Sequence, residues 1–182
     1  QLPECLASAR FAAETVVVDS GSRDDTVELA RRSGARVISR DWTGFGPQKN
    51  FAVASAAHDW VLCLDADERV TPELAASIAA LFATGTPPAV AYACARRNRF
   101  LGRWLAHGEG YPDWNVRLFD RRRARWTDDP VHEHVVADGR NWSTTVTGSN
   151  NAYFSISNWK LAAGRLFEPE EEQAGAAVCV IG

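Results

Sequence analysis

The sequence predicts an α/β domain with a mostly parallel sheet and flanking helices. Two apolar segments, residues 15–19 and 60–64, each run directly into acidic residues, which is typical of a strand that ends at a polar site. Segments with the spacing and length of helices alternate with the strands. Because ligands bind at the carboxyl ends of the strands in such sheets, the acidic residues there are the first candidates for a site.

Composition narrows the classes of protein to consider. Hydrophobic residues make up 46% of the 182-residue chain and the formal net charge is −3, which fits one globular domain and gives no overall attraction to nucleic acid. No apolar run approaches the roughly 20 residues of a membrane helix, although peripheral membrane contact stays open. The chain has no methionine and begins with Gln1, so we expect a fragment or a processed product.

The cysteines favour reduced thiols in a cytosolic protein. None belongs to a C-x-x-C pair, and one lies inside the predicted strand at 60–64, which disfavours a disulfide framework or a zinc site. The four are Cys5, Cys63, Cys94 and Cys179.

The first 39 residues predict a helix followed by a β-α-β unit. Residues 2–11 have helical spacing, and the strand at 15–19 ends at Asp19. In the polar turn that follows, Ser22 is expected to cap the next helix, with Asp25 completing a capping box. That helix, 26–33, ends at Gly34, and residues 35–39 return as a strand. The unit should be parallel and right-handed.

Three further elements are predicted between residues 41 and 95. A loop rich in glycine and aromatic residues leads to Pro47, expected as the first residue of a helix to about residue 57. After the strand at 60–64, Thr71 is placed as the N-cap and Pro72 as the first residue of a helix that runs to residue 84, before Gly85. Residues 89–95 predict a strand.

Asp65 and Asp67 follow the strand at 60–64 and form a D-x-D motif. Two positions apart on an extended chain, they project to the same side, where their oxygens suit Mg²⁺ or Mn²⁺ together with a phosphorylated ligand. The alternative is that Asp65 caps a turn and Asp67 is only solvated.

Several segments in order resemble the inverting family 2 glycosyltransferases. They are VVVDSGSRDDT at 16–26, GFGPQKNFA at 44–52, WVLCLDADERVTPEL at 60–74, RLFDRRRARW at 117–126 and DPVHEHV at 129–135. Within the family they are most similar to the branch that adds sugars, often glucose, to the lipopolysaccharide core. The resemblance covers residues 1–139 and implies a GT-A (Rossmann-like) catalytic domain, a UDP-sugar donor and a divalent metal, Mn²⁺ or Mg²⁺.

The resemblance also implies roles for particular residues. Asp19 and Ser20 would contact the base or ribose of the donor, and Lys49 would lie near the nucleotide. Asp65 would bind the ribose or sugar side of the donor, and Asp67 would ligate the metal on the diphosphate.

Inversion requires a base that deprotonates the acceptor hydroxyl. By family position that base is Glu133, with Asp129 as the second candidate. His132 or His134 would orient the base or contact phosphate, although both histidines could equally flank a strand and bind nothing. The H-E-H sequence is too short for the zinc motif H-E-x-x-H.

Arginines interleaved with aromatic residues gather at 96–104 and 117–126. Guanidinium groups suit phosphates and aromatic faces suit sugar rings, so a phosphorylated, lipid-linked saccharide acceptor would fit. Arg121, Arg122 and Arg123 are better interpreted as a solvated turn. Nucleic acid is a weaker interpretation because no aromatic RNA-binding signature accompanies the charge. The expected location is cytoplasmic, with contact at the cytoplasmic face of the inner membrane as an option.

Two departures from the family pattern leave alternatives open. The apolar first strand expected ahead of Leu2 is absent, which would leave a central sheet edge unpaired. Residues 140–182 form an atypical tail, which disorder would account for. One alternative is therefore a catalytically inactive fragment that binds nucleotide sugar. Another is a D-x-D phosphatase or phosphotransferase with Asp65 as nucleophile, although Arg69 stands where such enzymes carry a hydroxyl residue.

Overall fold

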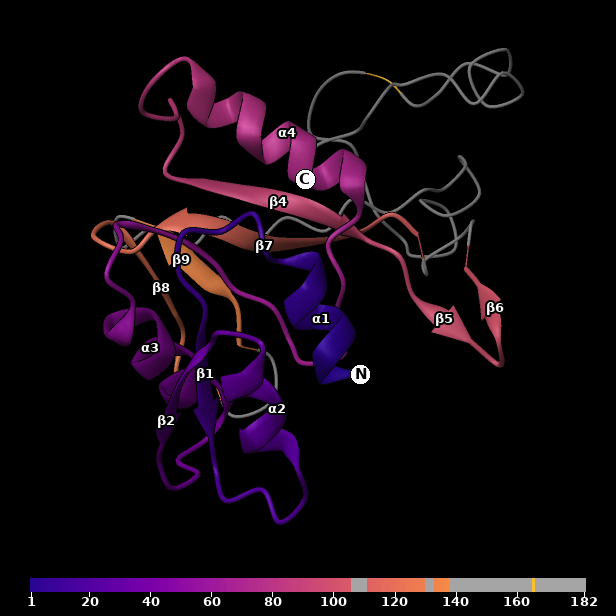
Figure 1. Cartoon of the computed structure of the whole chain (residues 1–182). Coiled ribbons are helices and arrows are strands. Elements are labelled where there is room, and N and C mark those ends of the chain that lie inside the picture. Colours follow the sequence, from indigo (N-terminus) through magenta and orange to yellow (C-terminus); the bar gives the residue numbers. More distant parts are fainter. Residues whose placement is uncertain (106–110, 130–132, 138–164, 166–182) are drawn as a thin grey trace.

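The computed structural model describes residues 1–105, 111–129, 133–137 and 165. Its helices are α1 (Leu2–Ser8), α2 (Thr26–Arg32), α3 (Phe45–Ser55) and α4 (Pro72–Ala83). Its strands are β1 (Val16–Asp19), β2 (Arg36–Ser39), β3 (Trp60–Leu62), β4 (Ala91–Arg96), β5 (Arg99–Phe100), β6 (Arg103–Trp104), β7 (Asp113–Asp120), β8 (Ala124–Trp126) and β9 (Val135–Ala137). Figure 1 shows their arrangement.

The α/β fold class is confirmed, but the expectation of a mostly parallel sheet needs correction. Among the described strands only β1 and β2 pair in parallel, as the predicted β-α-β unit requires. Strands β3 and β4 both pair antiparallel with β7, which lies between them. Strand β7 was not predicted from the sequence. Because β7 lies between them, β3 and β4 do not pair directly with each other, as neighbouring strands of a parallel sheet would.

Strands β1 and β3 belong to two separate sheets in the described part of the chain. Within the described residues, β1 pairs on one side with β2, and β3 pairs on one side with β7, with no ladder joining the two sheets. Each of these strands therefore keeps one edge without a strand partner.

Apolar side chains from the middle and the later part of the described chain build the main core. Val53 of α3, Val61 of β3 and Phe119 of β7 pack with two residues of β8, Ala124 and Trp126. Phe119 is fully buried. A second cluster joins α1 to the β1–β2 pair through Leu6, Ala30 and Ala35. Helix α4 lies along β4 (Figure 1). Its Phe82 packs edge-on against Trp60 of β3, with the two ring centres 5.4 Å apart.

The predicted helix ends are partly confirmed. Thr71 caps α4 by accepting a hydrogen bond from Leu74 N–H at 3.2 Å, and Gly34 and Gly85 have φ of +87° and +110° just beyond α2 and α4. The capping box at α2 is wrong, because Asp25 is the N-cap and has no side-chain cap bond. Helix α3 begins at Phe45, so Pro47 is its third residue.

The remaining described strands form two hairpins, β5–β6 and β8–β9. No helix in the described ranges is both long enough and apolar enough to cross a membrane. His132 and Cys179 lie outside the described residues, as does the predicted tail 140–182 apart from Arg165.

Candidate functional site

The D-x-D motif lies in a tight turn directly after β3. Strand β3 ends at Leu62, and Glu68 N–H donates to the Asp65 carbonyl at 2.9 Å. The expectation that Asp65 and Asp67 project together from an extended chain is therefore wrong, because the backbone reverses between them. Asp65 contacts Lys49 and Arg117 and is half-buried, whereas Asp67 is exposed.

Two residues that were not among the sequence-based candidates for the donor site hold Asp65 in place. Arg117 is 7% exposed, and its Nη2 donates to Asp65 Oδ2 at 3.0 Å and to Glu68 Oε1 at 2.7 Å. Glu68 also accepts the backbone N–H of Asp65 at 3.0 Å. The turn thus closes around a buried guanidinium, which neutralises the local negative charge.

Lys49 joins the predicted donor site to the predicted base. Its ammonium lies 2.8 Å from Glu133 Oε1 and 3.1 Å from Asp65 Oδ1. The same ammonium sits 4.5 Å from the centre of the Trp126 ring, which favours a cation at that position. The side chains of Lys49 and Glu133 are 20% and 14% exposed, so the bridge is largely shielded from solvent.

Neighbouring residues of α3 reach three different segments. Gln48 Nε2 donates to Ser20 Oγ at 2.8 Å, at the end of β1. Asn50 pairs with the backbone of Trp126, donating to its carbonyl and accepting its N–H, both at 2.9 Å. Because Lys49 lies between them, one helix connects the loop after β1, the D-x-D turn and the segment after β8.

Gly46 allows α3 to approach that segment closely. A Cβ atom on Gly46 would collide with the carbonyl oxygen of Thr127 and lie 3.2 Å from the Asp128 Cα. Four residues of the GPQKN sequence thus have a structural role. Gly46 lets the helix approach the backbone at Thr127, and Gln48, Lys49 and Asn50 each make a specific polar contact.

Asp19 uses its carboxylate to shape its own loop. It accepts hydrogen bonds from the backbone N–H of Gly21 at 3.0 Å and of Ser22 at 3.2 Å, and Gly21 has φ of +92°. Hydrogen bonding by the Ser22 side chain, together with these N–H groups, lowers the pKa of Asp19 below its ordinary value. Asp19 is 8% exposed, and these hydrogen bonds outweigh the opposing effect of burial on its pKa.

Asp129 lies apart from this bridge. It is exposed, and its Oδ2 is 3.7 Å from His134 Nδ1. Of the two candidate bases, Glu133 is the one that contacts Lys49.

A divalent metal would find few protein ligands at the D-x-D turn. No group of three or more His, Cys, Asp or Glu in the described part of the chain is arranged to hold a metal ion. Asp67 is nevertheless exposed on the turn beside Asp65. One protein carboxylate completed by phosphate oxygens and water is a common way to hold Mg²⁺, so the residues fit a metal that arrives with a diphosphate.

The arginine-rich segment divides into two parts. Arg117 is buried in the site, so its guanidinium is not open to an acceptor. Residues 121–123 form the expected turn, but two of them also support the fold. Arg122 pairs with Asp120 at 2.6 Å and Asp59 at 2.9 Å, and Arg121 donates to the Ala54 carbonyl at 3.2 Å.

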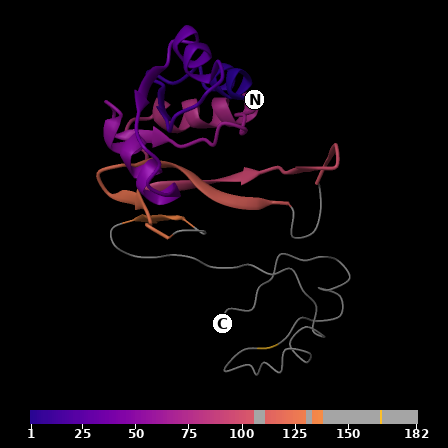
Figure 2. The same ribbon diagram turned by 90° about the horizontal axis from the view of Figure 1, so that it is seen from below.

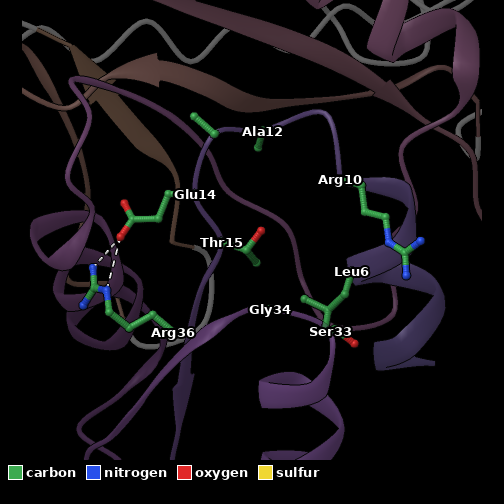
Figure 3. A pocket seen from close by; sticks show the side chains of 9 residues that line it. Leu6, Arg10, Ala12, Glu14, Thr15, Ser33, Gly34 and Arg36 are labelled. Carbon is green, nitrogen blue, oxygen red and sulfur yellow. Dashed lines mark hydrogen bonds and ion pairs between the residues drawn. The ribbon is translucent and has the colours of Figure 1, made fainter.

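The pocket in Figure 3 is separate from these residues. It lies where β1 and β2 begin. Its lining includes Leu6, Arg10 and Thr15, together with Glu14 and Arg36, which form an ion pair at 2.7 Å. The acidic candidates follow the opposite, carboxyl ends of the strands, where parallel sheets bind their ligands.

The family follows from comparison of the whole chain. A model of glycosyl transferase family 2 matches residues 1–137, which include every segment of the site. The chain belongs to glycosyl transferase family 2. A model of the MacB-like periplasmic core domain also matches residues 109–182, which is less than half of the chain and overlaps the first match.

Two relatives of this family 2 chain are named as glycosyltransferases. The lipopolysaccharide core biosynthesis glycosyltransferase LpsC of Rhizobium meliloti is 32% identical over 154 residues, which are 81% of this chain and 56% of that protein. The uncharacterized glycosyltransferase RC0292 of Rickettsia conorii is 46% identical over 71 residues, 39% of this chain and 25% of that protein. The chain thus spans about a quarter to a half of the length of these relatives.

Proposed function

We propose that this family 2 chain transfers a sugar, glucose being the expected one, from a UDP-sugar to a saccharide acceptor with inversion. The acceptor we propose is lipid-linked and of the lipopolysaccharide core type, reached at the cytoplasmic face of the inner membrane. Both relatives named above are glycosyltransferases, and LpsC is named for lipopolysaccharide core biosynthesis.

One observation supports this function most directly. Lys49 lies between Asp65, proposed to bind the donor, and Glu133, proposed as the base. A diphosphate entering beside Asp65 would meet the Lys49 ammonium, which attracts phosphate oxygens strongly. Lys49 would then share its charge with the donor, leaving Glu133 freer to accept a proton.

The proposed reaction is a single displacement. The acceptor oxygen attacks the anomeric carbon as the bond from that carbon to the phosphate oxygen breaks, and the acceptor proton passes to the Glu133 carboxylate. Asp19 and Ser20 would hold the nucleotide. Asp67 would hold the divalent metal, which stabilises the charge that develops on the departing diphosphate.

Calorimetric titration with UDP-glucose, with and without Mn²⁺, tests the donor site. We expect binding that depends on the metal and is weakened at least about tenfold by Asp67→Asn, because one charged ligand is lost. Asp59→Asn is the matched control, since Asp59 lies before β3 and pairs with Arg122. Absence of donor binding by the folded chain would refute the proposal.

The second candidate is a nucleotide-sugar-binding chain without turnover. The edges of β1 and β3 that have no strand partner among the described residues favour it, because an incomplete sheet positions its site less rigidly. Donor binding without release of UDP in the presence of a core saccharide would support this candidate over the transferase. Both candidates agree with family membership, which the D-x-D phosphatase interpretation does not.

A further inference from the structure

The β5–β6 hairpin carries the most exposed apolar surface of the described chain. Leu101 is 87% exposed and Phe100 is 64% exposed, and Trp104 in the same hairpin is 57% exposed. The hairpin projects beyond the end of the β4–β7 pair in both Figure 1 and Figure 2. Trp114, also 64% exposed, lies on β7 opposite Ala95, close to where the hairpin begins.

The turn of this hairpin is built from an unfavourable residue. Phe100 pairs with Arg103, so Leu101 and Gly102 form the two-residue loop. Their φ angles are +46° and +79°, a combination for which Asn-Gly is strongly preferred. A leucine at the first position costs conformational energy and gains no burial, so folding alone does not account for its side chain.

All the charged side chains of the hairpin are positive. Residues 97–105 contain Arg97, Arg99 and Arg103 and no acidic residue, and within the described residues none of these arginines forms an ion pair. Arg97 lies 5.5 Å from the Tyr111 ring and Arg99 lies 5.9 Å from the Trp104 ring. An apolar tip surrounded by arginines and tryptophans is the composition that binds a membrane interface.

The hairpin is also connected to the site. Arg96, at its base, pairs with Asp113 at 2.7 Å and with Glu68 at 3.7 Å. Glu68 belongs to the turn that holds Asp65. A surface bound by the hairpin would therefore lie at a set distance from the proposed donor site.

We propose that the β5–β6 hairpin anchors the protein to an anionic phospholipid bilayer, with Phe100 and Leu101 entering the headgroup region and the arginines contacting lipid phosphates. The choice of a bilayer follows from charge complementarity and from the apolar tip. The inference deepens the proposed function and rests on it, because a lipid-linked acceptor would be presented at the same surface.

Sedimentation of the full 182-residue chain with vesicles tests the anchor. The vesicles contain phosphatidylcholine, alone or mixed with phosphatidylglycerol, and no saccharide. We expect binding to the anionic vesicles that weakens as salt is raised. Replacing Arg99 or Arg103 by Gln should weaken it about fivefold each. Equal binding to both kinds of vesicle, or none to either, would overturn the proposal.

The decisive variant is Leu101→Asn. Asparagine suits the turn better than leucine, so the fold should be kept or stabilised, while vesicle binding should fall at least about tenfold because the apolar side chain is lost. Trp42→Ser is the matched control: Trp42 is also exposed, at 54%, but lies before α3, and its loss should leave vesicle binding unchanged. Undiminished binding by Leu101→Asn would overturn the proposal.

Two further measurements distinguish a bilayer from a second copy of the chain, and the anchor from the donor site. If sedimentation velocity shows that Leu101→Asn dissociates an oligomer, the hairpin tip binds a second copy and the bilayer proposal is wrong. Titration with UDP-glucose reports on the donor site alone. Absence of donor binding in the unaltered chain as well as in every variant would therefore refute the proposed function, while the vesicle results would still decide the anchor.

Discussion

The ammonium of Lys49 and the carboxylate of Glu133, 84 positions apart in the sequence, lie 2.8 Å from each other. The same ammonium is 3.1 Å from Asp65. This one ammonium therefore contacts two carboxylates from segments far apart in the sequence, and Asp65 also pairs with Arg117 at 3.0 Å. Removing it leaves both without their shared partner.

Lys49→Met should destabilise the folded chain by about 1–3 kcal/mol, because the shielded Glu133 carboxylate loses its cation, whereas Asp65 is 40% exposed and keeps Arg117. Glu133→Gln should cost less, since Lys49 keeps Asp65. The double variant should be less destabilised than the sum of the two single ones. Urea unfolding measures all three, with Lys49→Arg as the control that keeps the charge. Strict additivity would show that the bridge carries no coupling energy.

Gly46→Ala should cost about 3 kcal/mol of stability, since its methyl group meets backbone rather than a movable side chain. Gly34→Ala offers a useful comparison. Gly34 has open space around it but a φ of +87°, so alanine there should cost only about 1–2 kcal/mol. Thermal unfolding of both variants shows which one loses more stability. An unchanged stability of Gly46→Ala would contradict the close packing of α3.

Asn50→Asp keeps the shape of the side chain but removes the donor to the Trp126 carbonyl and places a negative charge beside it. We expect a loss of about 2 kcal/mol at neutral pH. Protonation of the new carboxyl restores a donor, so the deficit should shrink as the pH falls toward about 4. Urea unfolding across that range, with wild type in parallel, measures the difference; a deficit independent of pH would argue against the paired bonds.

Alkaline stability should depend on Cys63. Burial raises the pKa of its thiol from 9.0 to about 11, so the folded state retains a proton that the unfolded state releases. The stabilisation is complete below about pH 9 and is lost as the pH rises through 11. Unfolding free energy should therefore fall over this range, and Cys63→Ala should flatten the fall. Cys94→Ala, at a less buried thiol, is the comparison.

Local features of the fold were predictable because they depend on neighbouring residues. The cap at Thr71, the glycines after α2 and α4, and the alternation of the first strands and helices all follow from short-range sterics and hydrophobic spacing. Strand β7 was missed because its arginine and polar residues hide the strand pattern. Only pairing with β3 and β4, far away in the sequence, makes that segment a central strand.

Candidate residues were predictable by type and motif, whereas their partners were not. Arg117 was grouped with acceptor-binding arginines, yet it is buried against Asp65 and Glu68. The position of Arg117 between Val116 and the apolar pair Leu118–Phe119 is the signal that could have indicated a buried ion pair. Glu68 and Asn50 gave no such signal. The residues around them in the sequence would look the same if the two side chains were exposed and made no contacts.

By itself, the sequence determined the four helices and the strands β1 to β4, that acidic residues follow β1 and β3, and which family the motifs resemble. These properties are local or are carried by the order of short motifs. The tertiary structure alone decided that α3 joins Ser20, Asp65, Trp126 and Glu133, and that the D-x-D motif forms a turn around Arg117. Such contacts cannot be inferred from spacing, because the charge balance between distant side chains exists only once the chain has packed them together.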